Sequence, residues 1–557
     1  MTVSSAKIKD YGEKKQSSDS QVSSTLSLEV GTAAGKIMQQ STHQTNKPVH
    51  RVNGAYGFET FSLSCDLAAE RPIYLFVSRD QSIALWGQDI ELVLLAARDY
   101  QSISVNEQAV SFLLQDGVVP PPLSAYEDLY IVSIGISVEL SCVHDRIAVR
   151  IEERFPFARA LETSNSSGAT SSTPKGFEPD RFLDLLASAV SHRMPSDSEM
   201  TLFHSAGKDS NTIALALAKA GLARNVRSVT YRAPGRNDES AIVSEVCHKL
   251  GFQHEILDIA ELNRAGEVTE LSDFYKHSAL PCMDNASLLY PMVGRSIGLD
   301  QFVIDGMGSD AFIGHIPPAS EQRKAYLAKS LRAFSRVAAP FMGTLKAQSV
   351  SKTRAHYCGL SGFSGNELSS FYPFVTDTGF DTDAHWSAFS QQHSGEGYVN
   401  FRARTRGGII DTEKFTRKIR CAAQVYRWDL CLPWANEHVA QYVFGLPNRE
   451  LFDRSKHKNK LFIRALLKDE LSLDSDKLGK LGFAFDYYDV LKRNRDFVDA
   501  QIEDCALWDD AQIRNELDSL WFASEQNGSL NAHSRLRLHR LFLVSVWANN
   551  TWVLNDD

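Results

Sequence analysis

One stretch constrains the fold more than any other: Thr201 to Gly221, TLFHSAGKDSNTIALALAKAG. Its first residues, Thr201 to His204, form a short apolar run that is typical of a buried strand. Ser205 to Asp209 are small or polar residues typical of a turn, and Thr212 to Lys219 are helix formers with apolar residues at helical spacing. The stretch therefore predicts a strand, a tight loop and a helix in succession.

The predicted loop has the composition of a phosphate-binding site. A helix that begins at a loop directs unpaired backbone N–H groups and its positive dipole end toward that loop, which favours an anion there. Gly207 allows close approach of the backbone, and Lys208 adds a positive charge. Ser205 and Ser210 offer hydroxyl donors. Asp209 would repel a bare phosphate but suits a divalent cation that bridges phosphate oxygens, so the loop predicts magnesium together with a polyphosphate.

The loop Ser205 to Ser210, SAGKDS, resembles the pyrophosphate loop S-G-G-x-D-S of the ATP pyrophosphatases. Ala206 replaces one glycine of that pattern. The chain contains no G-x-x-x-x-G-K-[ST] sequence, so this is not a Walker A loop. A strand-to-helix turn that binds no ligand is the alternative.

Composition narrows the class of protein. With 557 residues, 43% of them hydrophobic and 23% charged, the chain is typical of a soluble protein of two or three domains. Its net charge of −9 indicates no general attraction to nucleic acid or to an anionic membrane. The eight cysteines are scattered, without C-x-x-C or zinc spacing, which predicts reduced thiols. No apolar run reaches the roughly 18 residues that span a bilayer, and no apolar signal segment follows the first lysines, so we expect a cytoplasmic protein.

Changes in composition divide the chain into four parts. Residues 1–50 are rich in Ser, Thr, Gln and Lys and predict a disordered tail. Residues 51–162 carry short apolar runs separated by turn residues, which predict an α+β domain. A Ser/Thr/Gly-rich linker follows over 163–178, and residues 179–557 form the larger domain.

The order of elements after the linker predicts the architecture of the larger domain. Beyond the loop, residues 226–232 predict a strand, Asp238 begins a helix, and residues 254–259 predict another strand. Strands that alternate with helices form parallel sheets, which bind ligands at the carboxyl ends of their strands. We therefore expect an α/β fold, a doubly wound parallel sheet with a helical C-terminal part, and the loop at its ligand-binding edge.

Four later stretches complete a resemblance to the asparagine synthetases. Residues 302–315, FVIDGMGSDAFIGH, resemble the G-E-G-[AS]-D-E loop of that family, and CLPWAN at 431–436 resembles its R-V-P-F-L-D. KLFIRALL at 460–467 and KLGF at 480–483 resemble its K-x-L-L-R-x-A-L helix and its R-P-K-x-G-F stretch. With the pyrophosphate loop, the resemblance covers about residues 182–489. It implies a synthetase domain of the adenine nucleotide alpha hydrolase type that uses ATP and Mg²⁺.

The resemblance also implies functional residues. Asp209 and Asp310 would bind Mg²⁺ beside the triphosphate. Lys480 corresponds to the catalytic lysine of the family, although Lys477 competes for that assignment. Asp429 corresponds to a glutamate of the β-lactam synthetases and would act as a base or bind the amine; the alternative is a surface or helix-capping aspartate. The residues expected to bind ATP and its pyrophosphate are Phe203 and Tyr231 around the adenine and ribose, and Ser205, Gly207, Lys208, Asp209, Ser210, Asp305 and Gly306.

Several departures separate this chain from a true asparagine synthetase. The first domain, through its segment 116–140, resembles the Ntn-hydrolase-like glutaminase domain of the family, but that glutaminase uses an N-terminal cysteine where this chain has Thr2. Met307 replaces a glutamate of the family loop, and Ala311 replaces the glutamate after Asp310. The first domain is therefore interpreted as a degenerate glutaminase domain with a structural or docking role.

Together these features predict an ATP-dependent, AMP- and pyrophosphate-forming amide ligase or cyclase, similar to β-lactam synthetases and lasso-peptide cyclases. Its substrate would be a small-molecule, sugar or peptide carboxylate with an amine, and we expect neither nucleic acid nor a membrane as a partner. The alternatives are an ammonia-using asparagine synthetase, a catalytically silent scaffold, and a tRNA-thiolating pyrophosphatase, which would need a basic surface or paired cysteines. A homodimer or a biosynthetic partner protein stays open by analogy alone.

Overall fold

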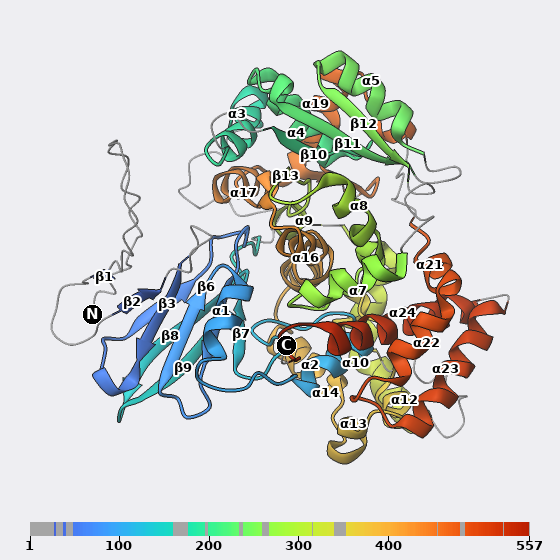
Figure 1. The fold of residues 1–557 in the computed structure, drawn as a ribbon. Helices are drawn as coiled ribbons and strands as arrows, with labels where there is room; N and C mark the ends of the chain where they lie inside the picture. The colour runs from blue at the N-terminus through green and yellow to red at the C-terminus, as the bar shows by residue number, and fades with distance from the viewer. Residues whose placement is uncertain are drawn as a thin grey trace.

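An N-terminal unit of antiparallel sheets and a larger domain of a parallel sheet with many helices make up the fold (Figure 1). A β-rich N-terminal unit lies beside a larger domain, whose parallel sheet is at one end and whose C-terminal helices are at the other. No helix among the described residues is long and apolar enough to cross a membrane. The computed structural model describes residues 27–28, 37–40, 48–159, 176–194, 199–232, 238–258, 267–314, 316–338, 352–453, 455–478, 485–526 and 529–555.

A five-stranded parallel sheet forms the centre of the larger domain. The strand order is β12-β11-β10-β13-β14, so the direction of winding reverses at β10. All residues of β10 are buried, as expected for a strand covered on both faces. The predicted α/β fold with a parallel sheet is confirmed. The strands are β10 (Met200–Phe203), β11 (Val226–Arg232), β12 (Gln253–Asp258), β13 (Phe302–Ile304) and β14 (Asp429–Cys431).

The register of this sheet brings two loops together. Met200 pairs with Phe302, so β10 and β13 start and end at similar levels. The loop after β10, residues 205–210 (the phosphate loop), therefore meets the loop after β13, residues 305–310 (the glycine loop), at the carboxyl edge of the sheet. Asp429 also pairs with Phe302, so it lies at the start of β14, where the amino ends of the parallel strands meet.

Helices surround the sheet and extend the domain. α4 begins within the phosphate loop, at Lys208, and α5 packs against β11 and β12. A π-helix over Ala403–Thr416 leads into α16 and packs against α9. The helices of the larger domain are α3 (Pro179–Ser191), α4 (Lys208–Lys219), α5 (Ser240–Leu250), α7 (Glu267–His277), α8 (Tyr290–Ile297), α9 (Asp310–Ile313), α10 (Ala319–Ala338), α12 (Gly365–Leu368), α13 (Pro373–Thr378), α14 (Thr382–Gln392), α15 (Tyr398–Arg402), α16 (Arg417–Val425), α17 (Glu437–Phe444), α18 (Asn448–Leu451), α19 (Leu461–Leu471), α20 (Ser475–Leu478), α21 (Tyr487–Arg493), α22 (Arg495–Glu503), α23 (Asp510–Glu525) and α24 (Ser529–Asn550).

The N-terminal unit contains two antiparallel sheets, ordered β1-β2-β3-β6-β5-β7 and β4-β8-β9. Buried side chains from both sheets, among them Leu75 and Val138, form one apolar cluster. β2 pairs with β3, so the first sheet extends into the stretch expected to be a tail. Apart from β1 and β2, residues 1–47 lie outside the described residues, and so do residues 163–175 of the linker. The elements are β1 (Ser27–Leu28), β2 (Ile37–Gln40), β3 (Val49–Asn53), β4 (Phe61–Ser64), β5 (Ile73–Val77), β6 (Ile83–Gly87), α1 (Ile90–Ala97), α2 (Glu107–Gln115), β7 (Leu129–Val132), β8 (Ile136–Val143) and β9 (Arg146–Glu153).

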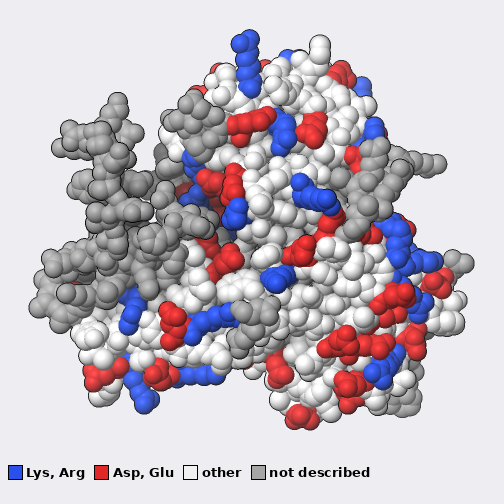
Figure 2. Space-filling view, viewed as in Figure 1, with Lys and Arg blue, Asp and Glu red and all other residues white. Residues whose placement is uncertain are grey.

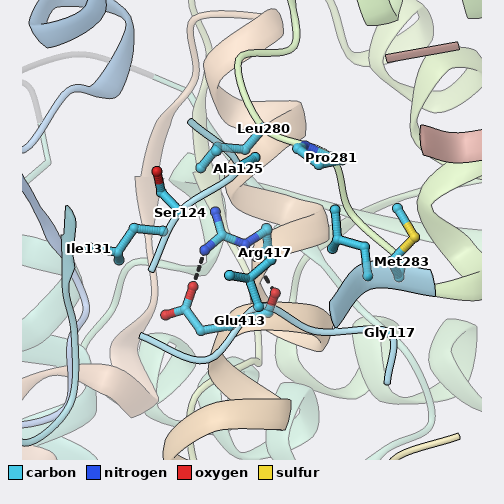
Figure 3. A pocket seen from close by; sticks show the side chains of 11 residues that line it. Gly117, Ser124, Ala125, Ile131, Leu280, Pro281, Met283, Glu413 and Arg417 are labelled. Carbon is cyan, nitrogen blue, oxygen red and sulfur yellow. Dashed lines mark hydrogen bonds and ion pairs between the residues drawn. The ribbon is translucent and has the colours of Figure 1, made fainter. Parts of the chain in front are cut away.

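The N-terminal unit and the larger domain meet around a small cavity (Figure 3). Its volume of about 10 Å³ is near the minimum that holds one water molecule. Arg417 and Glu413 form a buried ion pair at this cavity. The Ser133 hydroxyl of the N-terminal unit donates to Glu413 Oε1 over 2.8 Å. Paired polar groups thus join the two units.

Arg540 of α24 forms a second buried connection between the units. Its side chain is 0% exposed, and its Nη1 donates to the carbonyl of Leu114 over 3.1 Å and to the carbonyl of Ser361. A Cβ atom at Gly117 or Gly362 would overlap the guanidinium, so these glycines are needed for its fit. Burial lowers the pKa of Arg540 to about 10, so the group stays charged at neutral pH.

We expect Arg540→Met to destabilise the protein by roughly 3 kcal/mol, because two buried carbonyls lose a charged donor. The thermal unfolding midpoint would report this loss. The matched control is Arg514→Met, since Arg514 lies on α23 with a side chain that is 60% exposed and an ion pair worth at most about 1 kcal/mol. Equal shifts in both variants would contradict the structural role of Arg540.

Candidate active site

The phosphate loop has the predicted strand–loop–helix geometry. β10 ends at Phe203, and α4 begins at Lys208 with Gly207 as its N-cap. The first N–H groups of a helix have no acceptor within the helix, so those of α4 are directed at the loop. Two hydroxyls line the loop: the Ser205 and Ser210 oxygens lie 3.1 Å apart, and Ser205 also accepts from the Gly207 N–H over 3.2 Å. The loop therefore offers donors of the kind that hold phosphate oxygens.

Lys460, which the sequence analysis did not assign to the site, lies at its centre. Its Nζ is 2.8 and 2.7 Å from the two carboxylate oxygens of Asp209, 2.7 Å from Ser309 Oγ and 3.1 Å from Asp310 Oδ1. The residue is 4% exposed and precedes α19 with a left-handed backbone, φ 55° and ψ 45°. The structure therefore brings Asp209 and Asp310 together, as predicted, around a buried ammonium.

The charge of Lys460 is stabilised by its partners. Burial by itself lowers the pKa of this lysine, but the nearby carboxylates of Asp209 and Asp310 outweigh burial and raise the pKa above its usual value. Lys460 therefore stays protonated at neutral pH. The only signal for it in the sequence was its position at the start of the KLFIRALL stretch, which was used for the family resemblance alone.

The donor set of this cluster fits magnesium. Carboxylate oxygens are the ligands that Mg²⁺ prefers, and this ion keeps several waters and binds substrate phosphates instead of filling a protein cage. Within the described residues no group of three or more His, Cys, Asp and Glu side chains could hold a metal. Asp209 and Asp310 could contribute one carboxylate each to a Mg²⁺ that also binds phosphate oxygens. The Lys460 ammonium between them shows that the position already favours a cation.

The glycine loop packs closely against the start of α4. A Cβ atom at Gly306 would lie 3.3 Å from the Ser210 amide nitrogen, so the two loops approach backbone to backbone. Gly308 has a φ of +108° and faces Ala435. Asp305 is buried and accepts from the Met307 N–H over 2.9 Å. Burial raises the pKa of Asp305 to about 6, although the Lys418 charge and this hydrogen bond act against the shift.

Aromatic rings lie at the same edge of the sheet. The ring centroids of Phe203 and Tyr231 are 5.5 Å apart, and those of Phe203 and Tyr290 are 6.5 Å apart. The structure thus brings the two residues expected around the adenine and ribose into contact. Phe203 is 7% exposed, and its ring also packs on that of Trp428.

One predicted residue, Asp429, is not brought to this cluster. Asp429 lies at the opposite edge of the sheet, where its carboxylate contacts Arg193 over 2.9 Å and Arg71 over 3.7 Å. Asp429 does not join the cluster because it is the first residue of β14, and the site follows the last residues of the strands. Its assignment as a base or as a residue that binds the amine stays a prediction. Lys480 lies outside the described residues.

The π-helix approaches the backbone at Asp310 and Ala311 closely. Ala311 is 4% exposed, and a Cβ atom at Gly407 of the π-helix would lie 2.7 Å from its Cα and 3.0 Å from the Asp310 carbonyl oxygen. The π-helix therefore fixes the backbone that carries Asp310.

We expect Lys460→Met to expose the repulsion between Asp209 and Asp310, since like charges at short range oppose ionisation of both. Mg²⁺ should then raise the melting temperature of the variant by roughly 3 °C more than that of the wild type, about 1 kcal/mol of extra binding. The double variant Lys460→Met, Asp310→Asn removes one carboxylate and should lose this extra shift. Equal Mg²⁺ effects on wild type and Lys460→Met would contradict the assignment.

Sequence comparison assigns the chain to a family. A model of the asparagine synthase family matches residues 181–538, a range that contains the phosphate loop, the glycine loop and Lys460. No curated protein matches the chain. Because the match covers more than half of the sequence, the chain belongs to the asparagine synthase family, whose members are ATP-dependent carbon–nitrogen ligases.

Proposed function

We propose that this protein is an AMP- and pyrophosphate-forming amide ligase or cyclase that adenylates a carboxylate and captures it with an amine. The observation that carries the proposal is the convergence of Asp209, Asp310 and Lys460 at the phosphate loop. This loop lies where the sheet reverses its winding, the usual ligand position in such folds. Family membership supports the use of ATP.

The proposed reaction has two steps. A carboxylate oxygen of the substrate attacks the α-phosphorus of ATP, the bond from that phosphorus to the bridging oxygen breaks, and pyrophosphate leaves. An amine then attacks the acyl carbon of the adenylate, the acyl–oxygen bond breaks, and AMP leaves with the former carboxylate oxygen. The amine loses one proton as the amide forms.

The residues of the site suit the first step. Donors from Ser205, Ser210 and the first turn of α4 would bind the pyrophosphate oxygens, where negative charge increases in the transition state. Lys460 would supply a buried positive charge at the same place, without the need for water to reorganise. Mg²⁺ held by Asp209 and Asp310 would neutralise charge on the departing pyrophosphate. Lys480 is proposed, by resemblance, as a second cation near the reacting phosphate.

The nucleotide base would lie against the aromatic edge. Phe203 and Tyr231 offer ring surface beside the strand ends, and Asp305 and Gly306 would be adjacent to the ribose and phosphates. This arrangement is proposed from the position of these residues around the phosphate loop.

Two positions at which the chain differs from asparagine synthetases, 307 and 311, support a substrate other than aspartate. Met307 of the glycine loop packs against the hydrophobic core and has no proton to exchange. Ala311 is buried beneath the π-helix where the family has a glutamate. A larger substrate, such as a specialised metabolite, a peptide or a sugar acid that carries its own amine, needs neither group.

The N-terminal unit is compatible with a reaction that takes its amine from a source other than glutamine. Its two sheets pack through apolar side chains such as Leu75 and Val138. The cavity between this unit and the larger domain has room for about one water. We therefore propose that the unit keeps a glutaminase-like fold in a structural role.

Surface charge supports a small-molecule or peptide substrate over a nucleic acid. Figure 2 shows Lys and Arg interspersed with Asp and Glu over the displayed face. The net charge of −9 points the same way, since a nucleic-acid surface is normally basic.

The test is pyrophosphate release from ATP and Mg²⁺, screened against pools of small carboxylic acids and amino acids, aspartate included. We expect release that depends on one acid and that falls at least about 100-fold in Asp209→Ala, because charge stabilisation at the leaving group is lost. Asp180→Ala is the matched control, because its carboxylate lies on α3 and is 89% exposed.

Each alternative gives a different result in this screen. Release that depends on aspartate and ammonia would assign an asparagine synthetase. Release in Asp209→Ala equal to that of the wild type would contradict the proposed site. Absence of Mg²⁺-ATP binding to the wild type, judged by an unchanged melting temperature, would favour the scaffold.

A further inference from the structure

A buried histidine precedes the phosphate loop and is not used by the proposed reaction. His204 follows the last residue of β10, and its side chain is nearly inaccessible, with the residue 3% exposed. Both ring nitrogens have partners: Nδ1 lies 2.9 Å from Ser228 Oγ, and Nε2 lies 3.1 Å from Asn211 Oδ1. The ring thus connects β11 to the first turn of α4.

Hydrogen-bond direction fixes the proton on this ring. The Asn211 Nδ2 group donates to the carbonyls of Ser205 over 3.0 Å and Gly207 over 2.7 Å, so its oxygen must face the histidine. An amide oxygen only accepts, so His204 Nε2 must carry a hydrogen. In an uncharged ring Nδ1 is then an acceptor, and it receives the hydroxyl hydrogen of Ser228.

The donor series starts on α5. The Cys247 thiol lies 3.1 Å from Ser228 Oγ and donates to it. Each group from Cys247 through Ser228 and His204 to Asn211 therefore donates to the next, and the series ends on the carbonyls of the phosphate loop. Reversal of the Asn211 amide would bring its oxygen against two carbonyl oxygens, which repel it.

A second series holds the backbone of His204 itself. The Ser244 hydroxyl lies 3.0 Å from His254 Nδ1, and His254 Nε2 lies 2.9 Å from Thr230 Oγ1. Thr230 donates to the His204 carbonyl over 2.9 Å. Glu239, at the start of α5, accepts from the Ala206 N–H over 2.7 Å. Hydrogen bonds from β11 and from the start of α5 thus fix the backbone at His204 and Ala206.

These hydrogen bonds affect how the loop would bind phosphate oxygens. Peptide carbonyls carry partial negative charge, and those of Ser205 and Gly207 lie in the loop that would bind anionic oxygens. The Asn211 amide donates to both carbonyls, and the Ser210 hydroxyl lies 2.9 Å from the first and 3.3 Å from the second. These hydrogen bonds reduce the repulsion between the carbonyls and a nearby anion. Burial lowers the pKa of His204 to about 4, so the ring remains uncharged and its Nδ1 remains an acceptor at neutral pH.

We propose that His204 is a positioning residue for nucleotide binding: its uncharged Nε2–H form orients the Asn211 amide, which donates to the Ser205 and Gly207 carbonyls and reduces their repulsion of the phosphates. The inference rests on the proposed use of ATP by this loop. His204 does not contact the reacting atoms in this account. It acts through Asn211, and its substitution should affect phosphate affinity more than base affinity.

The test compares Mg²⁺-ATP with adenosine as ligands, by calorimetric titration of the full-length protein. In His204→Leu and Asn211→Asp we expect the Kd of Mg²⁺-ATP to rise about tenfold, while the Kd of adenosine stays within twofold of the wild type. Asn211→Asp keeps the side-chain shape but cannot donate to the carbonyls. His204→Gln, whose amide can donate to Asn211, should recover most of the ATP affinity.

The outcomes separate this inference from the proposed function. Wild type that binds no Mg²⁺-ATP would overturn the proposed function and this inference with it. Wild-type binding with unchanged ATP affinity in both variants would overturn the positioning role alone, as would equal losses for ATP and adenosine, which indicate general damage.

A spectroscopic measurement tests the hydrogen-bond direction without a ligand. In wild type labelled with ¹⁵N-histidine, the His204 signal, identified by its loss in His204→Gln, should show the Nε2–H form at neutral pH. An Nδ1–H or doubly protonated ring would overturn the proposal.

Discussion

The site depends on one interaction: the ammonium of Lys460 between the carboxylates of Asp209 and Asp310. Two acidic side chains at the ends of neighbouring strands would repel each other without a cation. Lys460 supplies that cation within the fold, and the same carboxylates suit Mg²⁺ when a polyphosphate is bound. Several features of the surrounding fold, including the close approach at Gly306 and the packing of the π-helix on Ala311, hold these three groups in place.

Two different surroundings meet at the cluster: a hydrogen-bonded support of the phosphate loop and the glycine loop that carries Met307. Behind the phosphate loop, hydrogen bonds from α5 and β11 fix the backbone through His204 and Asn211. In front of it, the glycine loop carries Met307, whose apolar side chain differs from the acid of asparagine synthetases. The proposed function combines a nucleotide site kept from the family with an altered acceptor region, as expected of an enzyme that keeps its activation step and changes its substrate.

The sequence predicted the parts of this arrangement that depend on local pattern. The strand, loop and helix around Ser205 and the parallel sheet follow from the spacing of apolar residues. The pairing of Asp209 with Asp310 was implied by the family resemblance. Lys460 could not be found in this way, because its neighbours in space are about 150 to 250 residues away in the chain. The position of Asp429 could not be predicted either, because correspondence to a family position does not reveal which end of a short strand a residue occupies. The hydrogen bonds of His204 likewise join β10, β11 and α4, and only the folded structure brings these elements together.

The most direct test of the central claim follows the carboxylate oxygen. The wild-type protein would be incubated with ATP, Mg²⁺ and a pool of small carboxylic and amino acids whose carboxylates carry ¹⁸O, and the nucleotide products would be analysed by mass spectrometry. The account predicts pyrophosphate and AMP with one ¹⁸O atom in its phosphate, because the carboxylate oxygen attacks the α-phosphorus and leaves with AMP. ADP and phosphate as products, or AMP without label, would contradict it.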